Sequence, residues 1–241
     1  MSLDRRHFLG LGAAALAAVV ITPGLRLIEL VQARSPEEAA SVLQRWGLLI
    51  DTGKCTDCEA CVGACHEENG VTGHGRPSTD AQWIRKVNLR DKRTGHAQTL
   101  PLMCQHCEHP PCVDVCPTGA SFKRADGIVL VDKHTCIGCR YCVMACPYGA
   151  RSFIHETVTD QKPDVPRGKG TVEACTLCVH RIDRGEQPAC VEACTRDGGK
   201  AMLFGDLNDG AGELQQRLRQ ERSTQLRADL VLNPGVHYQR L

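Results

Sequence analysis

The chain has 241 residues, of which 16 are cysteine and only 4% are aromatic. Its formal net charge is +1, from 29 Lys and Arg against 28 Asp and Glu, so charge gives no reason to expect nucleic acid as a partner. The length allows one large domain or two small ones. Because large aromatic side chains are scarce, disulfides or bound metal are the candidates for what holds the fold together.

The first 33 residues differ in composition from the rest and predict an export signal. Arg5 and Arg6 precede the weakly apolar stretch LGAAALAAVVITPG, and VQA at 31–33 is typical of a signal cleavage site. The motif RRHFL resembles a twin-arginine signal, although the residues on either side of it depart from that pattern. We therefore expect a periplasmic protein that is exported by the twin-arginine route.

The alternative for this segment is an uncleaved membrane anchor, because its apolar run approaches the roughly 18–20 residues that a spanning helix needs. Pro23 and Arg26 cut the run short, which favours the cleaved signal. The twin-arginine route typically carries proteins that are already folded around a cofactor. Cysteines behind such a signal indicate a metal cofactor, whereas disulfides are usual in other secreted proteins.

Two segments of the mature chain predict helices. SPEEAASVLQRW at 35–46 predicts a short one, with Ser35 as the N-cap and Pro36 at the first helical position. AGELQQRLRQERSTQLRADL at 211–230 predicts a polar helix, because its three leucines have spacings that can share one stripe. This tail is too polar to cross a membrane.

Two other stretches repeat one pattern and predict an internal repeat. GLLIDTGKC at 47–55 and GIVLVDKHTC at 127–136 each run from a short apolar strand into a cysteine. In both, an aspartate stands four residues before that cysteine. We interpret these aspartates, Asp51 and Asp132, as turn or cap residues rather than acids in a reaction.

The cysteines fall into four groups of four, each ending in C-x3-C. Groups one and three have the spacing C-x2-C-x2-C-x3-C, group two widens the middle gap by two residues, and group four widens it to eleven. The last cysteines of groups two and three each begin one copy of a second internal repeat, CPTGASF and CPYGARSF, which we call the two Cys-Pro echoes. In chain order the groups are Cys55, Cys58, Cys61 and Cys65; Cys104, Cys107, Cys112 and Cys116; Cys136, Cys139, Cys142 and Cys146; and Cys175, Cys178, Cys190 and Cys194.

This rhythm is typical of ligands to cubane [4Fe–4S] clusters, each of which needs four thiolates. Three cysteines at i, i+3 and i+6 can wrap one cube, and a small residue such as Gly138 lets the backbone approach the sulfurs. In two-cluster ferredoxins the fourth cysteine of the run ligates the other cluster and is followed by proline. We therefore expect the groups to exchange their fourth cysteines in pairs.

Groups two and three both end in Cys-Pro, so we expect them to form one pair, which leaves groups one and four as the other. The outer pair lacks the proline after its fourth cysteines. The predicted iron ligands of the four [4Fe–4S] clusters are Cys104, Cys107 and Cys112 with Cys146; Cys136, Cys139 and Cys142 with Cys116; Cys55, Cys58 and Cys61 with Cys194; and Cys175, Cys178 and Cys190 with Cys65.

Zinc and disulfides are the alternatives for these cysteines. Structural zinc uses two C-x2-C knuckles per ion and leaves no role for the third cysteine or for the C-x3-C-P ending. Disulfides need Cα atoms within about 7 Å of each other and do not require a fourfold rhythm. Both alternatives explain less of the pattern than iron–sulfur clusters do.

Five histidines adjoin the cysteines, but cysteine already supplies every ligand that the cubes need. We interpret these histidines as neighbours of the clusters or as surface residues. The sequence contains no Ser-His-Asp set, phosphate loop or dinucleotide fingerprint, so we expect an electron carrier without catalytic residues of its own. The five are His66, His106, His109, His134 and His180.

Residues from about 47 to 207 resemble the four-cluster ferredoxin-like subunits of the dimethyl sulfoxide reductase type. The features that carry this resemblance are the four cysteine groups, their order and FGDLND at 204–209. The stretches CQHCEHPPCVDVCPTGASFKRADGIVLVDKHTCIGCRYC and GTVEACTLCVHRIDRG, with the twin-arginine signal, are most similar to the exported iron–sulfur subunit of the membrane complex associated with dissimilatory sulfite reductase. The resemblance implies an α+β fold of two ferredoxin-like domains, the second inserted into the first. The outer domain would comprise 34–95 and 155–241, with a C-terminal helix, and the inner domain 96–154.

The same resemblance implies a role in electron transfer. Electrons would pass through the four clusters between a polytopic quinone-interacting membrane subunit and a periplasmic multihaem cytochrome c, and these partners would hold the chain at the membrane. The alternative is an iron–sulfur subunit of a periplasmic molybdopterin oxidoreductase, or of a nitrite, tetrathionate or polysulfide reductase. A third hypothesis, from another class, is a secreted binding module held together by disulfides.

Overall fold

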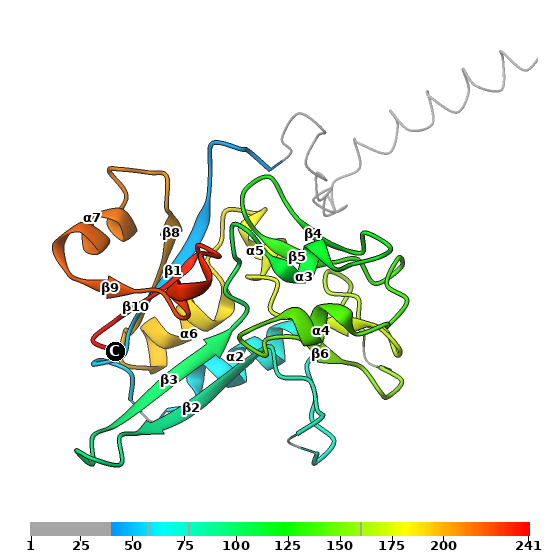
Figure 1. Ribbon diagram of the computed structural model, residues 1–241, viewed down its shortest axis with the longest axis horizontal. Helices are drawn as coiled ribbons and strands as arrows, with labels where there is room; N and C mark the ends of the chain where they lie inside the picture. The colour runs from blue at the N-terminus through cyan, green and yellow to red at the C-terminus, as the bar shows by residue number, and fades with distance from the viewer. Residues whose placement is uncertain (1–39, 57, 77, 160) are drawn as a thin grey trace, which may run out of the picture. The chain divides into compact units, whose positions relative to one another are not determined.

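The computed structural model describes residues 40–56, 58–76, 78–159 and 161–241 (Figure 1). The predicted export signal at 1–33 lies outside these residues, as does the start of the helix predicted at 35–46. No helix in the described ranges is long and apolar enough to cross a membrane.

The described part of that predicted helix is not helical, so the prediction is wrong there. Residues 40–45 contain a turn and an extended segment, and Trp46 already begins a strand. The backbone N–H of Arg45 donates to Asp206 Oδ1 (2.9 Å), and that of Trp46 donates to the carbonyl of Asp126 (3.1 Å). These partners are distant in sequence, and they hold the chain extended against its local preference for a helix.

The largest sheet has four strands in the order β8-β1-β10-β9 (Figure 1). The strand predicted within 47–55 is confirmed as β1 (Trp46–Asp51), which pairs antiparallel with β8 (Met202–Asp206) and parallel with β10 (Val236–Gln239). At the edge of the sheet, β9 (Ser223–Thr224) pairs antiparallel with β10. The sheet thus brings the first and last strands of the described chain together.

Helix α7 (Glu213–Gln220) packs on this sheet through a small apolar cluster of its own. Leu49 of β1 lies in that cluster with Leu207 and Leu214, whereas its neighbours Leu48 and Ile50 belong to the main core. Because successive side chains of a strand point to opposite faces, β1 is covered on both sides.

The helix predicted at 211–230 is therefore present but too long in the prediction. It ends at Gln220, because Ser223 and Thr224 pair with β10 instead of continuing the helix. Beyond them, η3 (Ala228–Leu230) forms a short 3-10 turn. The C-terminal end of α7 is therefore set by the pairing of β9 with β10, which the spacing of the leucines does not predict.

Two helices that lie far apart in the sequence pack against each other beside the sheet (Figure 1). They are α2 (Ala60–Asn69) and α6 (Ala189–Asp197), and α6 also contacts β8. The hairpin of β2 (Ile84–Arg90) and β3 (Ala97–Met103) follows α2 in the chain and packs against it through β2.

The middle of the chain is built from very short elements. Helices α3 (Pro111–Asp114) and α4 (Tyr141–Ala145) pack together. The strands pair as two small hairpins, and α5 (Val179–Ile182) follows the second of them. The strand predicted in 127–136 is confirmed as β5. The pairs are β4 (Ser121–Lys123) with β5 (Val129–Val131), and β6 (Ser152–Phe153) with β7 (Val172–Glu173).

Few large side chains fill the interior, as the composition indicates. Trp83 and Tyr238 are the largest fully buried ones, and the Tyr238 hydroxyl donates to the carbonyl of Pro101 (3.0 Å) and accepts from Gln105 Nε2 (3.2 Å). Ten of the sixteen cysteines are also buried. The result is the loop-rich mixture of small sheets and helices that was predicted.

One close approach between loops requires glycine. Gly138 has a φ of +70°, and a Cβ atom there would collide with the carbonyl oxygen of Gly170, in the loop before β7. The backbone N–H of Val172 then donates to the sulfur of Cys136 (3.4 Å). Gly138 thus allows a close approach to the Gly170 loop, whereas the approach of its own backbone to the sulfurs stays a prediction.

We expect Gly138→Ala to destabilise the protein severely, and Gly119→Ala to do so mildly. Gly119 has the same φ of +70° but no atom within 4 Å of its hypothetical Cβ, so only the backbone strain remains, about 1–2 kcal/mol. Thermal unfolding of the two variants beside the natural protein measures the difference. Equal losses in both would contradict a role for the Gly138 approach.

Candidate iron–sulfur sites

Cysteines from different sequence groups share cavities in the structure. One cavity is lined by Cys104, Cys107, Cys112 and Cys146, together with three prolines, Val129 and Tyr148; we call these four cysteines the Cys104 quartet. A second is lined by Cys55, Cys58, Cys61 and Cys194, together with Pro101 and Met202; these form the Cys55 quartet. In each, three cysteines come from one group and the fourth from another.

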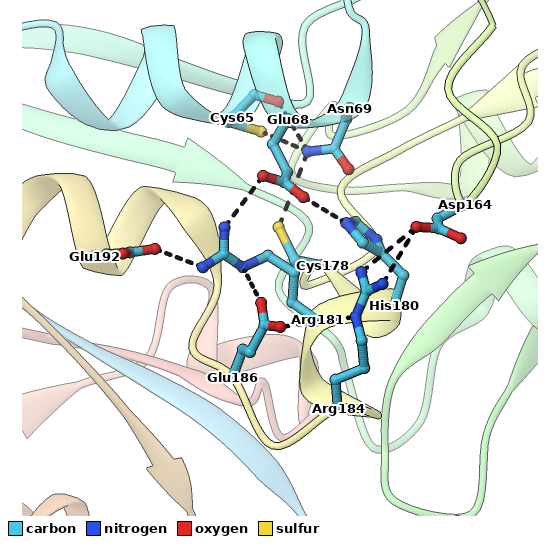
Figure 2. Close-up of polar contacts among 10 residues, drawn as sticks. All are labelled: Cys65, Glu68, Asn69, Asp164, Cys178, His180, Arg181, Arg184, Glu186 and Glu192. Atoms are coloured by element: carbon cyan, nitrogen blue, oxygen red, sulfur yellow. Dashed lines mark hydrogen bonds and ion pairs between the residues drawn. The ribbon is translucent and has the colours of Figure 1, made fainter. Parts of the chain in front are cut away.

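A third set, the Cys175 quartet, comprises Cys175, Cys178, Cys190 and Cys65. Burial and the nearby Cys65 raise the pKa values of both Cys175 and Cys190 well above the ordinary range. The side-chain amide of Asn69, at the end of α2, reaches two of the sulfurs: Nδ2 lies 3.7 Å from Cys65 Sγ and 3.9 Å from Cys178 Sγ (Figure 2). Asn69 is 1% exposed, so this donor is held in the interior.

The remaining cysteines, the Cys136 quartet, are Cys136, Cys139, Cys142 and Cys116. Cys142 is buried, and Cys136 and Cys116 are near enough to raise its pKa further. Cys139 is the one exposed cysteine of the chain. The structure therefore brings three members of this quartet together and places the fourth on the loop at the surface.

The quartets also have neighbours among themselves. Cys61 is close enough to influence the charge of Cys190, Cys104 does the same to Cys175, and Cys142 does so to Cys112. Each quartet is therefore an electrostatic neighbour of at least one other quartet.

Backbone N–H groups point at the sulfurs of the fourth cysteines. Ser121 N donates to Cys116 Sγ (3.3 Å), Ala150 N to Cys146 Sγ (3.5 Å) and Ala201 N to Cys194 Sγ (3.3 Å). Donors of this kind orient a thiolate and stabilise its negative charge when it binds a metal. Their presence fits a role of these cysteines as ligands.

The electrostatics of the buried thiols also fit iron. Burial, with Cys194 and Cys55 nearby, raises the pKa of Cys61 to about 12, and burial raises the pKa values of Cys104 and Cys107 to about 12. Such thiols stay protonated at neutral pH unless a metal cation replaces the proton, and the four irons of a [4Fe–4S] cluster would together bind four such thiolates.

All sixteen cysteines are free thiols, without a disulfide between them. In the described part of the chain, no three His, Cys, Asp or Glu side chains converge on a point that would hold one metal ion. The Cys104 and Cys55 quartets instead line small gaps, and Arg151 and Gln105 also line that of the Cys104 quartet. Four cysteines spread around a gap fit a cluster of several metal atoms.

The two predicted turn aspartates have that role. Asp51 Oδ1 accepts from Gly53 N (3.1 Å), and Asp132 Oδ1 accepts from His134 N (2.8 Å). In both turns the backbone carbonyl of the aspartate accepts from the N–H of the first cysteine of the group, at 3.2 Å for Cys55 and 3.1 Å for Cys136. The repeat in the sequence is therefore also a repeat in structure.

The histidines beside the cysteines differ in their surroundings: His66, His106 and His180 each have a buried ring nitrogen without a hydrogen-bond partner among the described residues, and the other two lie at the surface. His106 is buried, and its Nδ1 accepts from Val129 N (3.0 Å) while burial lowers its pKa to about 4. His180 Nε2 lies 2.7 Å from Glu68 Oε1 (Figure 2). His109 and His134 are exposed, and His66 is half-buried.

A network of polar contacts and ion pairs lies beside Cys65 and Cys178 of the Cys175 quartet (Figure 2). Glu68 of α2 pairs with His180 and with Arg181 Nη1 (3.1 Å) of α5, and Arg181 also pairs with Glu192 of α6 and with Glu186. These contacts join helices α2, α5 and α6 near the side-chain amide of Asn69. The role of Asn69 was not predicted, because an Asn-Gly pair at a helix end is typical of a cap.

Comparison with known proteins agrees with this geometry. Two family models, each described as a 4Fe-4S dicluster domain, match residues 54–120 and 95–207. The chain is 43% identical to the Hdr-like menaquinol oxidoreductase iron-sulfur subunit 1 of Archaeoglobus fulgidus, over 99% of this chain and 98% of the relative. It is 38% identical to a tetrathionate reductase subunit of Salmonella typhimurium, over 91% of this chain and 83% of the relative. It is 39% identical to a sulfite dehydrogenase subunit of Allochromatium vinosum, over 79% of this chain and 81% of the relative.

These matches cover most of the chain and agree with the cysteine groups, the loop-rich fold and the donors aimed at sulfur. The ligands that the chain supplies are those of [4Fe–4S] clusters. The chain belongs to the family of iron–sulfur electron-transfer subunits of oxidoreductase complexes, with two 4Fe-4S dicluster domains.

Proposed function

We propose that the chain carries four [4Fe–4S] clusters and relays electrons between a quinone-reactive membrane subunit and a periplasmic multihaem cytochrome c, in a membrane complex of dissimilatory sulfur metabolism. The observation that carries the electron-relay role is that cysteines from different sequence groups line shared cavities, with the thiols of other quartets as electrostatic neighbours. A relative whose name includes menaquinol oxidoreductase matches over nearly all of both chains, which supports a quinone-reactive partner.

The ligand sets of this proposal are the four quartets. Each would take its fourth cysteine from a different group, and the shared cavities of Cys146 with the Cys104 group and of Cys194 with the Cys55 group support that assignment for two of them. When bound, each cluster takes up and passes on one electron. The chain itself holds the ligands in order, buries most of them and aims hydrogen-bond donors at their sulfurs.

The domain arrangement is part of the proposal. An outer ferredoxin-like domain would comprise 34–95 and 155–241, and an inner one, 96–154, would be inserted into it. Pairing of β1 with β8 and β10 and packing of α2 against α6 support it, because both join the two ends of the described chain.

A second candidate function is electron transfer for a periplasmic molybdopterin oxidoreductase, or for a nitrite, tetrathionate or polysulfide reductase. The relatives named as tetrathionate reductase and sulfite dehydrogenase subunits favour this candidate. It shares the four clusters and differs only in the partners.

Double substitutions test the exchange of fourth cysteines. The natural chain should hold about sixteen iron atoms in four clusters. Cys104→Ala with Cys146→Ala removes two ligands of one proposed cluster, so about twelve iron atoms should remain. Cys104→Ala with Cys116→Ala removes ligands of two clusters, so about eight should remain. Iron and acid-labile sulfide analysis measures both, and the reverse ranking would contradict the exchange and indicate ligand sets that follow sequence order.

Replacement of the arginine pair tests localisation. We expect Arg5→Lys with Arg6→Lys to leave the loaded protein in the cytoplasm, because the twin-arginine route requires that pair. Cell fractionation with immunoblotting follows it, and the size of the natural protein in the periplasm distinguishes a cleaved signal from a retained anchor. Undiminished export of the double variant would contradict the twin-arginine route.

Capture of the natural complex tests the partners. Membranes are solubilised in mild detergent, the chain is captured, and its companions are identified by mass spectrometry and haem staining. We expect a polytopic quinone-reactive subunit and a c-type cytochrome. A large molybdopterin subunit in their place would contradict this proposal and favour the second candidate.

A further inference from the structure

Arg151 is a buried arginine directly before β6, with 5% of its surface exposed. The two Cys-Pro echoes, CPTGASF and CPYGARSF, differ in length by one residue, and Arg151 is the additional residue of the second copy. Its Nη2 donates to the hydroxyl of Ser121 (2.8 Å), the residue that follows Gly-Ala in the first copy. The inserted side chain thus joins the two echoes.

The guanidinium of Arg151 lies between the Cys104 and Cys136 quartets. It lines the cavity that the Cys104 quartet encloses, and Cys142 of the Cys136 quartet also lies beside it. Its Nε and Nη1 atoms are buried and have no hydrogen-bond partner among the described residues. Two donors of a buried cation are therefore left without an acceptor beside the cavity that the Cys104 quartet lines.

The charge of this group requires a negative partner. The neighbours of this group are Cys112 and Cys104 of one quartet and Cys142 of the other. Burial of a cation is unfavourable unless a negative group pairs with it. The hydrogen bond to neutral Ser121 does not supply that charge, whereas thiolates of bound clusters would.

We propose that Arg151 is a positioning residue shared by the two inner clusters, whose guanidinium faces cysteine sulfurs of both and raises both reduction potentials. This inference rests on the ligand sets proposed above, under which Cys112 and Cys142 belong to different clusters. An oxidised cube with four thiolates carries a charge of about −2, and reduction makes it more negative. A fixed cation in a low-dielectric interior stabilises the reduced form more than the oxidised form.

The Cys175 quartet provides an internal contrast. The donors that reach its sulfurs, the side-chain amide of Asn69 and the backbone N–H of Leu177, are uncharged. A neutral donor lacks the net charge that acts on a neighbouring cluster as well. The shared effect on two clusters should therefore be particular to Arg151.

The test compares Arg151→Met with Arg151→Lys in the loaded full-length chain, by redox titration followed with EPR spectroscopy. Methionine removes the charge and retains an unbranched side chain, whereas lysine keeps the charge. In R151M we expect the reduction potentials of two of the four clusters to fall. Each fall should correspond to at least a tenfold change in the ratio of oxidised to reduced cluster, which is about 59 mV for one electron. R151K should shift both by less, and Ser121→Ala, which leaves the charge in place, is the matched control.

Four loaded clusters with unchanged potentials in R151M would overturn the inference and leave the proposed function intact. A shift of one cluster alone would overturn the shared role. If R151M loads less iron, iron content becomes the readout: a loss in R151M but not in R151K supports the requirement for charge, and equal losses overturn it. A natural chain with fewer than four clusters would instead contradict the proposed function.

Discussion

The rest of the structure depends on the burial of thiols. Ten of sixteen cysteines are buried in a chain with few aromatic residues, so metal ligands occupy much of the space that large apolar side chains fill elsewhere. Burial raises the pKa values of most of these thiols, and a thiolate forms there only against a positive charge. Folding of the interior and binding of metal are for this reason coupled.

The surrounding chain meets this constraint in several ways. Backbone N–H groups face the fourth cysteines, the amide of Asn69 serves the Cys175 quartet, and a guanidinium lies between the two inner quartets. Around Asn69, the pairs of Glu68 with α5 fix the position of α2. Short helices and two-residue strands suffice in the middle of the chain, because the loops that carry the cysteines are positioned by these polar contacts as well as by packing.

Features that depend on neighbours along the chain could be predicted from the sequence. The cysteine rhythm, the strands at β1 and β5 and the turn roles of Asp51 and Asp132 are of this kind, since each turn is closed by groups within a few residues. Features that depend on distant partners could not. The segment before β1 is extended because Arg45 bonds to Asp206, and α7 ends early because the residues after it pair with β10.

Asn69 and Arg151 also have roles that depend on partners distant in the sequence. Asn69 has the sequence signature of a helix cap, and its reach to Cys178 follows from the packing of α2 near α5. Arg151 did carry a local signal, since it is the residue by which one echo exceeds the other. The role of this additional residue can be interpreted only from the fold, which places Ser121 beside Arg151.

The proposed sharing of fourth cysteines between groups would also impose an order on biosynthesis. With the proposed ligand sets, every ligand of the two inner clusters has left the ribosome once Cys146 has emerged. The Cys55 group, although it is made first, waits for Cys194, near the end of the chain. Until then its thiols lack their closing partner, so a nascent chain has its longest exposure to oxidation at the oldest of its cysteines. Protection of that segment during translation is therefore a requirement that the topology itself creates.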